Sequence, residues 1–510
     1  MYSKIQTVTF QGVNVLKITA EVQIASGLPS FTIVGLADKA VAESKERIRA
    51  ALHSLGLSLP AKRIIVNLAP ADVAKEGSHF DLPIALGLLS AMEIIPAEEL
   101  DSFIIMGELG LDGAIAPVSG ILPASVFATQ EDLGFVCPQD QGSEALWSAN
   151  PDIIAAPDLL SLMNHLKGEQ FLPKPQKTDP LDEKALQLLD MREIKGQETA
   201  KRALEIAAAG GHNMLMIGPP GSGKSMLAKR LPSILPPLTA KEMLETSIIH
   251  SIAGLLKEGR LVQTRPFRDP HHSASMPALA GGGAKARPGE ISLAHNGVLF
   301  LDELPEFQRA TLESLRQPME TGEVSIARAA CHITYPARFQ LIAAMNPCRC
   351  GYLGNTAMEC PRAPKCGAEY LAKISGPLLD RIDLHVEVPA VNPWELGQKE
   401  KDSPSSKQIA ARVFKARQIQ QNRYKSFNKP FLTNAGADGE FLEQTCALNE
   451  KGKNLLAKAA EKMGLSARGY FRILRVARTI ADMAGCEGVA CEHIAEALSY
   501  RRMNLNTFNY

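Results

Sequence analysis

The stretch GPPGSGKS, residues 218–225, decides the class of the fold. It fits the pattern G-x-x-x-x-G-K-[ST], in which the backbone N–H groups of a glycine-rich turn cradle phosphates. The apolar run Met214–Ile217 precedes it and a helical run, Ser225–Leu231, follows it. The phosphates would therefore lie at a helix N-terminus. This order of strand, loop and helix predicts a nucleoside-triphosphate site in an α/β domain.

A second stretch, VLFLDE at Val298–Glu303, reads as an apolar strand that ends in two acids. Asp302 is placed to complete the shell of a Mg²⁺ ion held by Ser225, and Glu303 to activate the attacking water as a general base. Lys224 would reach the β- and γ-phosphates. The alternative is a buried strand that happens to end in two acids. The nucleotide-binding set is Gly218, Pro219, Pro220, Gly221, Ser222, Gly223, Lys224, Ser225 and Asp302.

Three further signals are weak when each is taken alone. Asn346 ends the apolar run LIAAMN and could orient the same water, although a strand-end Asn is often a turn residue. Arg381 could stabilise a phosphoryl group across a subunit boundary, or form a surface salt bridge. The amphipathic run Leu465–Asp482 carries Arg468, Arg472, Arg475 and Arg478, which cannot all serve one nucleotide, so most are expected to be solvated or at interfaces.

Composition sets the broad class of protein. A chain of 510 residues is long enough for about three domains. The 45% hydrophobic and 22% charged content is ordinary for a globular protein, and 55 basic against 55 acidic residues advertise no nucleic-acid partner. No apolar run is long enough for a membrane span, and Met1–Thr19 lacks a signal-peptide pattern. We expect a cytoplasmic protein whose nine cysteines form no disulfide framework.

The chain divides by composition into four parts. Residues 1–168 alternate strand-like and helix-like runs, and residues 169–184 are rich in proline and polar residues, as linkers are. Residues 185–390 have the pattern of a nucleotide-binding α/β domain, and residues 391–510 read as mostly helical.

Four cysteines lie within residues 348–366, spaced C-x-C-x9-C-x5-C. Tetrahedral coordination by four thiolates suits a structural Zn²⁺ ion, although the first gap is shorter than usual. The alternative is four free buried thiols. The predicted zinc ligands are Cys348, Cys350, Cys360 and Cys366.

Local basic segments are the candidate DNA contacts. They comprise a glycine-hinged insert around Gly281–Gly283, the predicted hairpin Thr321–Arg338, and residues 401–430, where eight Lys/Arg face one Asp. Such groups suit a phosphate backbone, and subunit contacts are the alternative. The named candidates are Arg265, Arg268, His271, His272, Lys285, Arg287 and Arg328.

Nearly the whole chain resembles the YifB/ComM family of magnesium-chelatase-like AAA+ ATPases. The matching segments are FTIVGLA (31–37), VNLAP (66–70), DLPIAL (81–86), GPPGSGKS, RPFRDPHHSAS (265–275), GEISLAHNGVLFLDE (289–303), SGPLLDRID (375–383) and the run 465–482. The resemblance implies an AAA+ core with a helical lid, assembled as a homo-oligomeric ring, usually a hexamer. It assigns Asn346 as the sensor, Arg381 as an arginine finger supplied in trans, and Arg468 as the lid arginine, with Arg472 as the fallback.

The N-terminal part resembles the Lon protease domain, of the ribosomal S5 domain 2-like fold, at Lys75–Leu86 and Gly107–Leu122. Lon-type hydrolysis needs a serine nucleophile and a lysine base. The nucleophile position falls near His79, with Ser78 one residue away, and no lysine stands where the base belongs. We expect a non-proteolytic scaffold.

The resemblance implies an ATP- and Mg²⁺-dependent DNA motor that promotes branch migration of recombination intermediates during natural transformation. Its partners would be duplex or branched DNA and further copies of the chain, and no membrane. The alternative is a magnesium-chelatase-like or MoxR-like ATPase that remodels a protein partner. An ATP-dependent protease is disfavoured by the absent lysine.

Overall fold

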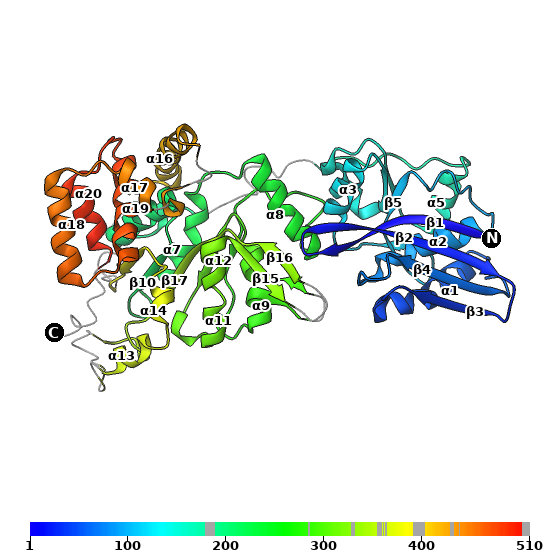
Figure 1. Cartoon of the computed structure of the whole chain (residues 1–510), viewed down its shortest axis with the longest axis horizontal. Coiled ribbons are helices and arrows are strands. Elements are labelled where there is room, and N and C mark those ends of the chain that lie inside the picture. The colour runs from blue at the N-terminus through cyan, green and yellow to red at the C-terminus, as the bar shows by residue number, and fades with distance from the viewer. Residues whose placement is uncertain are drawn as a thin grey trace.

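The chain forms an elongated molecule with an N-terminal α/β unit at one end and a helical bundle at the other (Figure 1). A nucleotide-binding sheet lies between them. The computed structural model describes residues 1–178, 189–283, 286–327, 332–353, 360, 362, 365–390, 403–428, 433–437 and 439–501. The predicted linker 169–184 lies partly outside these ranges, and residues 169–178 form neither helix nor strand.

The N-terminal sheet has seven strands among the described residues, in the order β3-β4-β2-β1-β5-β8-β9. Its strands are β1 (Tyr2–Gln11), β2 (Asn14–Ala25), β3 (Ser30–Val34), β4 (Arg63–Ala69), β5 (Phe103–Ile105), β8 (Gly134–Pro138) and β9 (Ile153–Ala156). The pair β1–β2 is a long antiparallel hairpin, whereas β5, β8 and β9 run parallel. The alternation of strands and helices predicted for residues 1–168 is confirmed.

Helix α2 (Asp81–Ala91) is buried on every side because ten of its eleven residues are uncharged and mostly apolar. Its one charge, Asp81, is held by Arg47 of helix α1 (Lys39–Ser54) through Nε at 2.6 Å and Nη2 at 2.9 Å. Pairing of this kind is what a buried carboxylate requires. Further helices are α3 (Ile121–Gln130), α4 (Gly142–Ala145) and α5 (Leu159–Leu166).

The nucleotide-binding sheet is parallel throughout, with the order β11-β14-β17-β10-β18. Its strands are β10 (Met214–Ile217), β11 (Phe267–Arg268), β14 (Val298–Leu301), β17 (Gln340–Met345) and β18 (Leu384–Glu387). Strands β10, β14 and β17 are almost wholly buried, as expected where helices cover both faces. The mixed α/β fold with a parallel P-loop sheet agrees with the AAA+ core predicted from the sequence.

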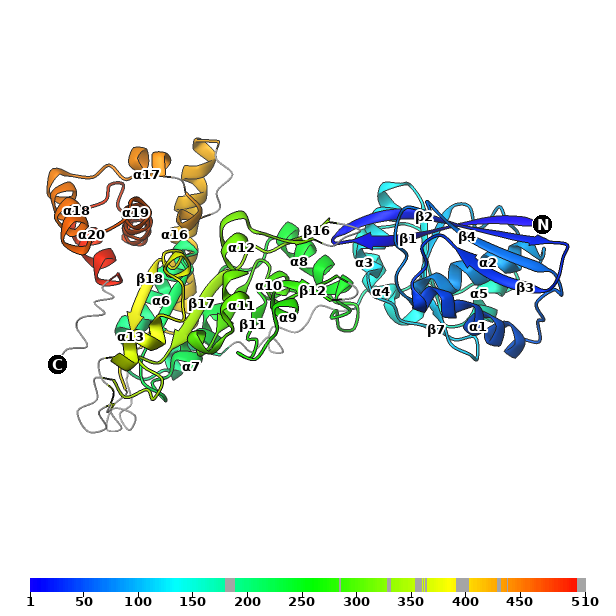
Figure 2. The ribbon, with the colours of Figure 1, turned by 60° about the horizontal axis from the view of Figure 1, so that its bottom comes forward.

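Two insertions extend this core toward the N-terminal unit. One contains α8 (Ala240–Ile252), α9 (Met276–Ala280) and the short pair β12 (Gly281–Gly282) and β13 (Arg287–Pro288). The other is the predicted hairpin, formed by β15 (Glu323–Ala327) and β16 (His332–Pro336). Figure 2 shows β16 beside the tip of the β1–β2 hairpin.

Contacts between the units are polar as well as apolar. The Ser251 hydroxyl of α8 donates to Oε1 of Glu144 at 2.6 Å, and the Trp147 indole donates to the carbonyl of Gly259 at 2.9 Å. At the hairpin tip, a Cβ on Gly12 would lie 2.8 Å from the carbonyl oxygen of Thr334, so glycine permits the close approach. The N-terminal unit is thus attached to both insertions.

The C-terminal part is helical where it is described, as expected. Its helices are α16 (Ser406–Ser426), α17 (Gly439–Thr445), α18 (Glu450–Met463), α19 (Ala467–Met483) and α20 (Cys491–Ser499). Helix α16 packs on α19 and on α6 (Glu198–Gly210), which lies against strand β18 of the nucleotide-binding sheet (Figure 2). No helix among the described residues has the length and apolar character needed to cross a bilayer.

Candidate functional site

The phosphate-binding loop joins β10 to helix α7 (Lys224–Arg230). Gly221 and Gly223 have φ of +74° and +90°, which glycine adopts without strain. The Lys224 ammonium donates to the carbonyls of Gly218 at 2.8 Å and Pro219 at 2.9 Å. Burial lowers the pKa of Lys224, and the nearby Asp302 and Glu303 carboxylates oppose this shift. The cation therefore lies at the centre of the loop.

Ser225 and Asp302 meet although 77 residues separate them in the sequence. The Ser225 hydroxyl, in the first turn of α7, donates to Oδ2 of Asp302 at 2.6 Å. Asp302 directly follows β14, whose carboxyl end lies at the same edge of the sheet as the loop. A hydroxyl and a carboxylate oxygen side by side are ligands that Mg²⁺ accepts.

Asn346 lies between the phosphate-binding loop and Asp302, because its strand β17 lies between β10 and β14. β17 pairs with β10 on one side and with β14 on the other, and Asn346 directly follows it. Its Oδ1 accepts from the Lys224 ammonium at 3.3 Å. The structure therefore brings Lys224, Ser225, Asp302 and Asn346 together at one edge of the sheet.

Glu303 is the next residue after Asp302 and has a left-handed backbone, with φ of +51°. Its amide donates to Oδ1 of Asp302 at 2.9 Å, and its side chain is half exposed. Oε2 lies 3.2 Å from Nδ1 of His272. The carboxylate proposed as general base thus has a histidine partner that the sequence placed among the DNA contacts.

Asp269 was not among the site residues predicted from the sequence. Burial raises the pKa of Asp269; the Lys229 ammonium opposes this, and the Asp302 carboxylate adds to it. Asp269 directly follows β11, which pairs in parallel with β14, so the segment beginning at Asp269 reaches the edge that carries Asp302. Asp269 could have been predicted as a strand-end acid like Asp302. The strand before it has only two residues, so the sequence shows no apolar run that would mark it.

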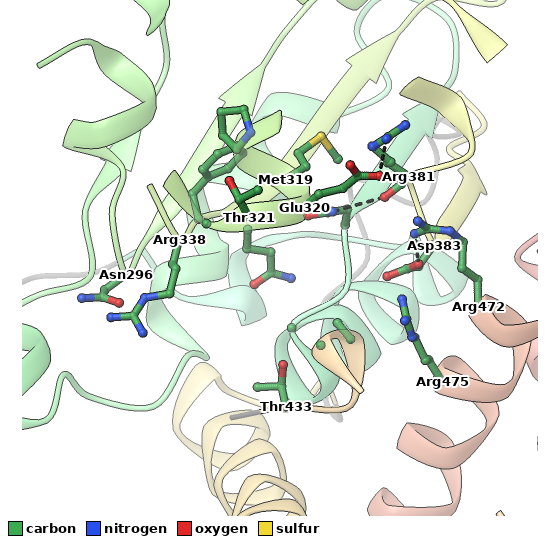
Figure 3. Close-up of a pocket in the computed structure, with 18 of the residues that line it drawn as sticks. Asn296, Met319, Glu320, Thr321, Arg338, Arg381, Asp383, Thr433, Arg472 and Arg475 are labelled. Carbon is green, nitrogen blue, oxygen red and sulfur yellow. Dashed lines mark hydrogen bonds and ion pairs between the residues drawn. The ribbon is translucent and has the colours of Figure 1, made fainter. Parts of the chain in front are cut away.

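A cavity of about 650 Å³ lies at the opposite edge of the sheet (Figure 3). Asn213, Gly297, Gln340 and Asp383, which line it, stand at or just before the amino ends of four strands. We call it the arginine cavity, because its lining includes Arg265, Arg338, Arg381, Arg417, Arg468, Arg472 and Arg475.

Arg381 is 7% exposed and lines this cavity. It donates to the carbonyl of Pro377 at 2.7 Å and pairs with Glu320, while its buried Nε has no partner among the described residues. Arg381 precedes β18, whereas the phosphate-binding loop follows the adjacent parallel strand β10. The four residues of β10 span about 13 Å, so Arg381 and the loop of the same chain lie on opposite edges.

The arginines of α19 have different environments. Arg472 donates to Oδ1 of Asp383 at 2.7 Å, and Figure 3 shows it reaching from α19 toward that carboxylate. Burial opposes the ionisation of Asp383, but His212, Arg472 and Arg475 hold its pKa well below the usual range. Arg468, in the first turn of α19, is exposed and lines the arginine cavity with Arg381.

The four clustered cysteines converge in space. The Sγ atoms of Cys348, Cys350, Cys360 and Cys366 all lie within 4.8 Å of one another. Zn–S bonds of about 2.3 Å place tetrahedral sulfurs a little under 4 Å apart, so the donor set fits a Cys₄ metal site. Gly351, with φ of +84°, packs on the phosphate-binding loop, since a Cβ there would lie 2.5 Å from Cδ of Pro220.

The predicted DNA contacts lie in several places. Arg265 donates to the carbonyls of Pro236 at 2.6 Å and Asn296 at 2.7 Å, and Arg268 pairs with Glu290 at 2.5 Å. These two guanidinium groups fix the fold around α8 and α10 (Glu290–Leu293). Arg287 is exposed, while Lys285 and Arg328 lie outside the described residues. His271 accompanies His272 at the nucleotide edge and lies 2.8 Å from the Ser273 hydroxyl.

In the N-terminal unit, Ser78 and His79 do not contact each other as a catalytic pair would, and each has another hydrogen-bond partner. The Ser78 hydroxyl donates to Glu108, and Nε2 of His79 lies 2.8 Å from the carbonyl of Val8. Burial lowers the pKa of His79 to about 4. The one buried lysine nearby in sequence, Lys75, donates to the carbonyl of Pro70.

Comparison with known proteins covers most of the chain. Residues 190–396 match the family described as magnesium chelatase, subunit ChlI, residues 20–141 match subunit ChlI of Mg-chelatase, and residues 403–501 match the ChlI C-terminal family. The competence protein ComM of Haemophilus influenzae is 45% identical over 497 residues, which cover 96% of each chain. YifB of Salmonella typhimurium is 43% identical over 97% of this chain and 96% of its own length. The magnesium-chelatase 38 kDa subunit of Rhodobacter capsulatus is 26% identical over 60% of this chain and 86% of its own.

Proposed function

We propose that this chain, which belongs to the YifB/ComM family of magnesium-chelatase-like ATPases, is an ATP-driven DNA motor that promotes branch migration during recombination and natural transformation. The observation that carries the motor assignment is the division of the nucleotide site between two edges of one sheet. The phosphate-binding loop lies at one edge, and a buried, incompletely paired arginine lies at the other. The likeness to the competence protein ComM supports DNA as the substrate.

The hydrolysis mechanism follows from the residues at the loop edge. Lys224 would bind the β- and γ-phosphates, and Ser225 and Asp302 would hold a Mg²⁺ ion, which would supply charge neutralisation at the phosphate oxygens. Glu303 accepts a proton from the attacking water as its oxygen bonds to the γ-phosphorus and the bond to the bridging oxygen of ADP breaks. Asn346 orients the water. This assignment is supported by the contacts among Lys224 and Ser225, which begin α7, and Asp302 and Asn346, which follow β14 and β17.

The arginine cavity completes the site of a neighbouring copy. Arg381 and Arg468 both line it, on the edge away from their own loop. A γ-phosphate from the neighbour would give the buried Nε of Arg381 an acceptor and would compete with Glu320 for the guanidinium. We infer a homo-oligomeric ring, hexameric by family resemblance, with Arg381 as the finger and Arg468 as the lid arginine.

The DNA contacts are proposed at the two insertions and on α16. Arg287 is exposed in strand β13, and Lys285 and Arg328 remain candidates that lie outside the described residues. Lys407, Lys415 and Lys425 are exposed on α16, whereas Arg265 and Arg268 serve internal contacts. Exposed cations in loops and along a helix suit the phosphate backbone of duplex DNA.

Two structural roles complete the proposal. The Cys₄ cluster would hold a Zn²⁺ ion that braces the segment between Asn346 and the phosphate-binding loop. The N-terminal unit would be a Lon-like domain that has lost proteolysis, because Ser78 pairs with Glu108 instead of a lysine. It would then serve the ring or the DNA as a scaffold.

The second candidate is a magnesium-chelatase-like or MoxR-like ATPase that remodels a protein partner. The matches to magnesium chelatase families favour it. Binding of labelled duplex DNA across a salt series separates the two functions, because phosphate contacts weaken steeply with salt. Affinity that is absent, or indifferent to salt, would favour the protein partner.

The decisive experiment measures ATP hydrolysis and the migration of a labelled four-way junction, with wild type and Glu303→Gln. We expect DNA to stimulate hydrolysis and the junction to move, with both activities lost in Glu303→Gln. Hydrolysis that ignores DNA, with no strand movement, would overturn the motor assignment and leave the ATPase.

A further inference from the structure

A second cavity, of about 460 Å³, lies where the N-terminal unit meets both insertions. We call it the junction cavity. Figure 2 shows the meeting point, with β16 at the tip of the β1–β2 hairpin. The N-terminal unit lines the cavity with residues 9–12, 72–74 and 76–79, and the insertions line it with Arg287, Ile333 and Tyr335. The hydrolysis mechanism uses none of these residues.

Part of the cavity lining is apolar. Leu36 is 63% exposed, and a large apolar side chain in this position gains free energy when an apolar group covers it. The same is true of the half-buried Phe10. The apolar lining residues are Phe10, Leu16, Leu36, Val73, Ile252 and Ile333.

Two hydroxyl groups of the lining already use their protons in hydrogen bonds. The Ser78 hydroxyl donates to Glu108, and the Tyr335 hydroxyl donates to the carbonyl of Ala286 at 2.9 Å. A hydroxyl has only one proton, so each of these oxygens can offer a ligand only an acceptor.

His79 adds an acceptor from a buried side chain. It is 6% exposed and lines the cavity. Its Nε2 lies 2.8 Å from the carbonyl oxygen of Val8, which can only accept, so Nε2 carries the ring proton. Burial lowers the pKa of His79 to about 4, so the ring is neutral and Nδ1 keeps its lone pair. Nδ1 has no hydrogen-bond partner among the residues that the structure describes.

Asp72 and Glu76 make the lining acidic. Neither carboxylate has a hydrogen bond or ion pair with another described residue. Burial raises the pKa of Tyr335 to about 12, and the nearby Glu76 carboxylate adds to this rise while Arg287 opposes it. With His79 neutral, two carboxylates and one guanidinium give the described lining a net charge of −1. An anionic ligand is therefore disfavoured, and a ligand rich in N–H donors is favoured.

We propose that the junction cavity binds an aliphatic ammonium group, whose N–H donors meet Asp72, Glu76 and Nδ1 of His79 while its carbon chain covers Phe10 and Leu36. A free diamine and the lysine side chain of a partner protein present this same chemistry. Binding does not depend on the proposed function. A second effect rests on it: an occupied cavity would hold the insertions, which carry the proposed DNA contacts, against the N-terminal unit.

The test measures binding by isothermal titration calorimetry with the full chain, at about 0.15 M salt, where attraction between exposed charges is screened. The first probe is cadaverine, a linear aliphatic diamine. Its bis-trimethylammonium analogue has the same carbon chain and charge but no N–H group. We expect the analogue to bind at least about tenfold more weakly than cadaverine, because it cannot make the charge-assisted hydrogen bonds. The second probe, Nα-acetyl-lysine amide, represents a protein side chain.

The protein offers matched controls. The double variant Asp72→Asn, Glu76→Gln should weaken cadaverine binding about tenfold or more. The double variant Glu98→Gln, Asp101→Asn makes the same change of charge at exposed acids that do not line the cavity, and should bind as wild type does. Ala40 also lines the cavity, so Ala40→Leu should block binding without any change of charge.

Each binding outcome decides the inference. It is overturned if neither probe binds, if the bis-trimethylammonium analogue binds as tightly as cadaverine, or if the loss of the Asp72 and Glu76 charges leaves the affinity intact. Should that double variant unfold in a thermal scan, the analogue and Ala40→Leu provide the comparison. Tighter binding of cadaverine assigns the site to free amines, and tighter binding of the lysine derivative assigns it to a protein side chain.

The second effect is tested by DNA-stimulated ATP hydrolysis with and without saturating cadaverine. A change of about twofold or more in wild type, absent from the Asp72→Asn, Glu76→Gln variant, supports the coupling. Equal changes in both proteins, or none, reject the coupling and leave the site. A wild type that no DNA stimulates refutes the proposed function, while the calorimetry still decides whether the cavity binds an ammonium group.

Discussion

Gly351 shows how one residue connects the cysteine cluster to the phosphate-binding loop. It lies between the cysteines of the cluster and presses on Pro220, so a side chain there would displace the phosphate-binding loop. Its φ of +84° is a second reason for glycine. The two effects can be separated, because Gly485 has φ of +72° and no atom lies within 4 Å of the position that its Cβ would take.

We expect Gly351→Ala to raise the KM for ATP about fivefold or more, because the new methyl group moves Pro220. Both Gly351→Ala and Gly485→Ala should lose about 1 kcal/mol of unfolding free energy from the left-handed backbone. ATP titrations of the hydrolysis rate, with thermal unfolding of each variant, give both numbers. An unchanged KM in Gly351→Ala would show that the contact with Pro220 does not control the loop.

At the scale of elements, the sequence predicted those strands that are marked by a run of apolar residues next to loop residues. The run Met214–Ile217, the hairpin around Thr321–Arg338 and the strand before Asn346 were each marked by apolar residues and loop residues, and all are confirmed as strands. β11, with two residues, was missed because its place depends on pairing with β14 far along the chain. That omission also hid Asp269 and the true surroundings of His272.

Helix α16 shows a different limit of sequence reasoning. Its basic run was predicted to be a candidate DNA contact, yet Arg412 pairs with Glu205, Arg423 with Asp482, and Arg417 with the carbonyl of Ala208. These arginines attach the helix to α6 and α19. Charge in a sequence does not reveal its partner, because the acids lie roughly 60 to 210 residues away.

The cysteine segment is the element whose chemistry can be tested most directly. We expect purified protein to contain about one Zn²⁺ per chain, and Cys350→Ser to lose most of it, because tetrahedral coordination needs all four thiolates. Cys486→Ser, an exposed cysteine outside the cluster, should keep the metal. Metal analysis and thiol titration after chelation provide the measurement. A wild-type protein purified without chelators that contains no metal would favour four free thiols.

At the scale of the whole molecule, the join between the N-terminal unit and α8 contains a buried carboxylate. Glu144 is 4% exposed and accepts from the Ser251 hydroxyl and the amide of Leu122. Burial raises the pKa of Glu144, although these hydrogen bonds and Gln141 oppose the shift. The fold therefore favours the protonated form. The protonated Glu144 side chain contributes its full stability below the unfolded pKa of about 4.3. This contribution is lost as the pH rises through the pKa of Glu144 in the native protein.

Glu144→Gln should remove this pH dependence, because a neutral amide still accepts from Ser251. We expect the variant to be about 1 kcal/mol more stable than wild type at pH 8 and no more stable at pH 4. Urea unfolding of the full chain across this range, followed by tryptophan fluorescence near Trp147, measures it. The exposed Glu98→Gln is the control. Parallel curves for wild type and Glu144→Gln would contradict the assignment.

Assembly can be tested by mixing two inactive chains. Arg381→Ala should lower ATP hydrolysis by about 10³-fold or more, as loss of an arginine finger does, and Glu303→Gln should also be inactive. In a mixed ring, the loop of an Arg381→Ala chain meets the intact Arg381 of a Glu303→Gln neighbour, so hydrolysis should return in part. Mixtures that stay as inactive as their components would place both groups in one chain's own site.

The parallel direction of β10 and β18 has a consequence for growth of the proposed assembly. Each chain would offer its arginine cavity to one neighbour and its phosphate-binding loop to the other, so the contact would be heterologous, head to tail, without a two-fold axis. An open row of subunits would then end in one loop without an arginine and one arginine without a loop. Closing the circle would remove both idle ends at once, and full turnover per subunit would become a property of the closed circle.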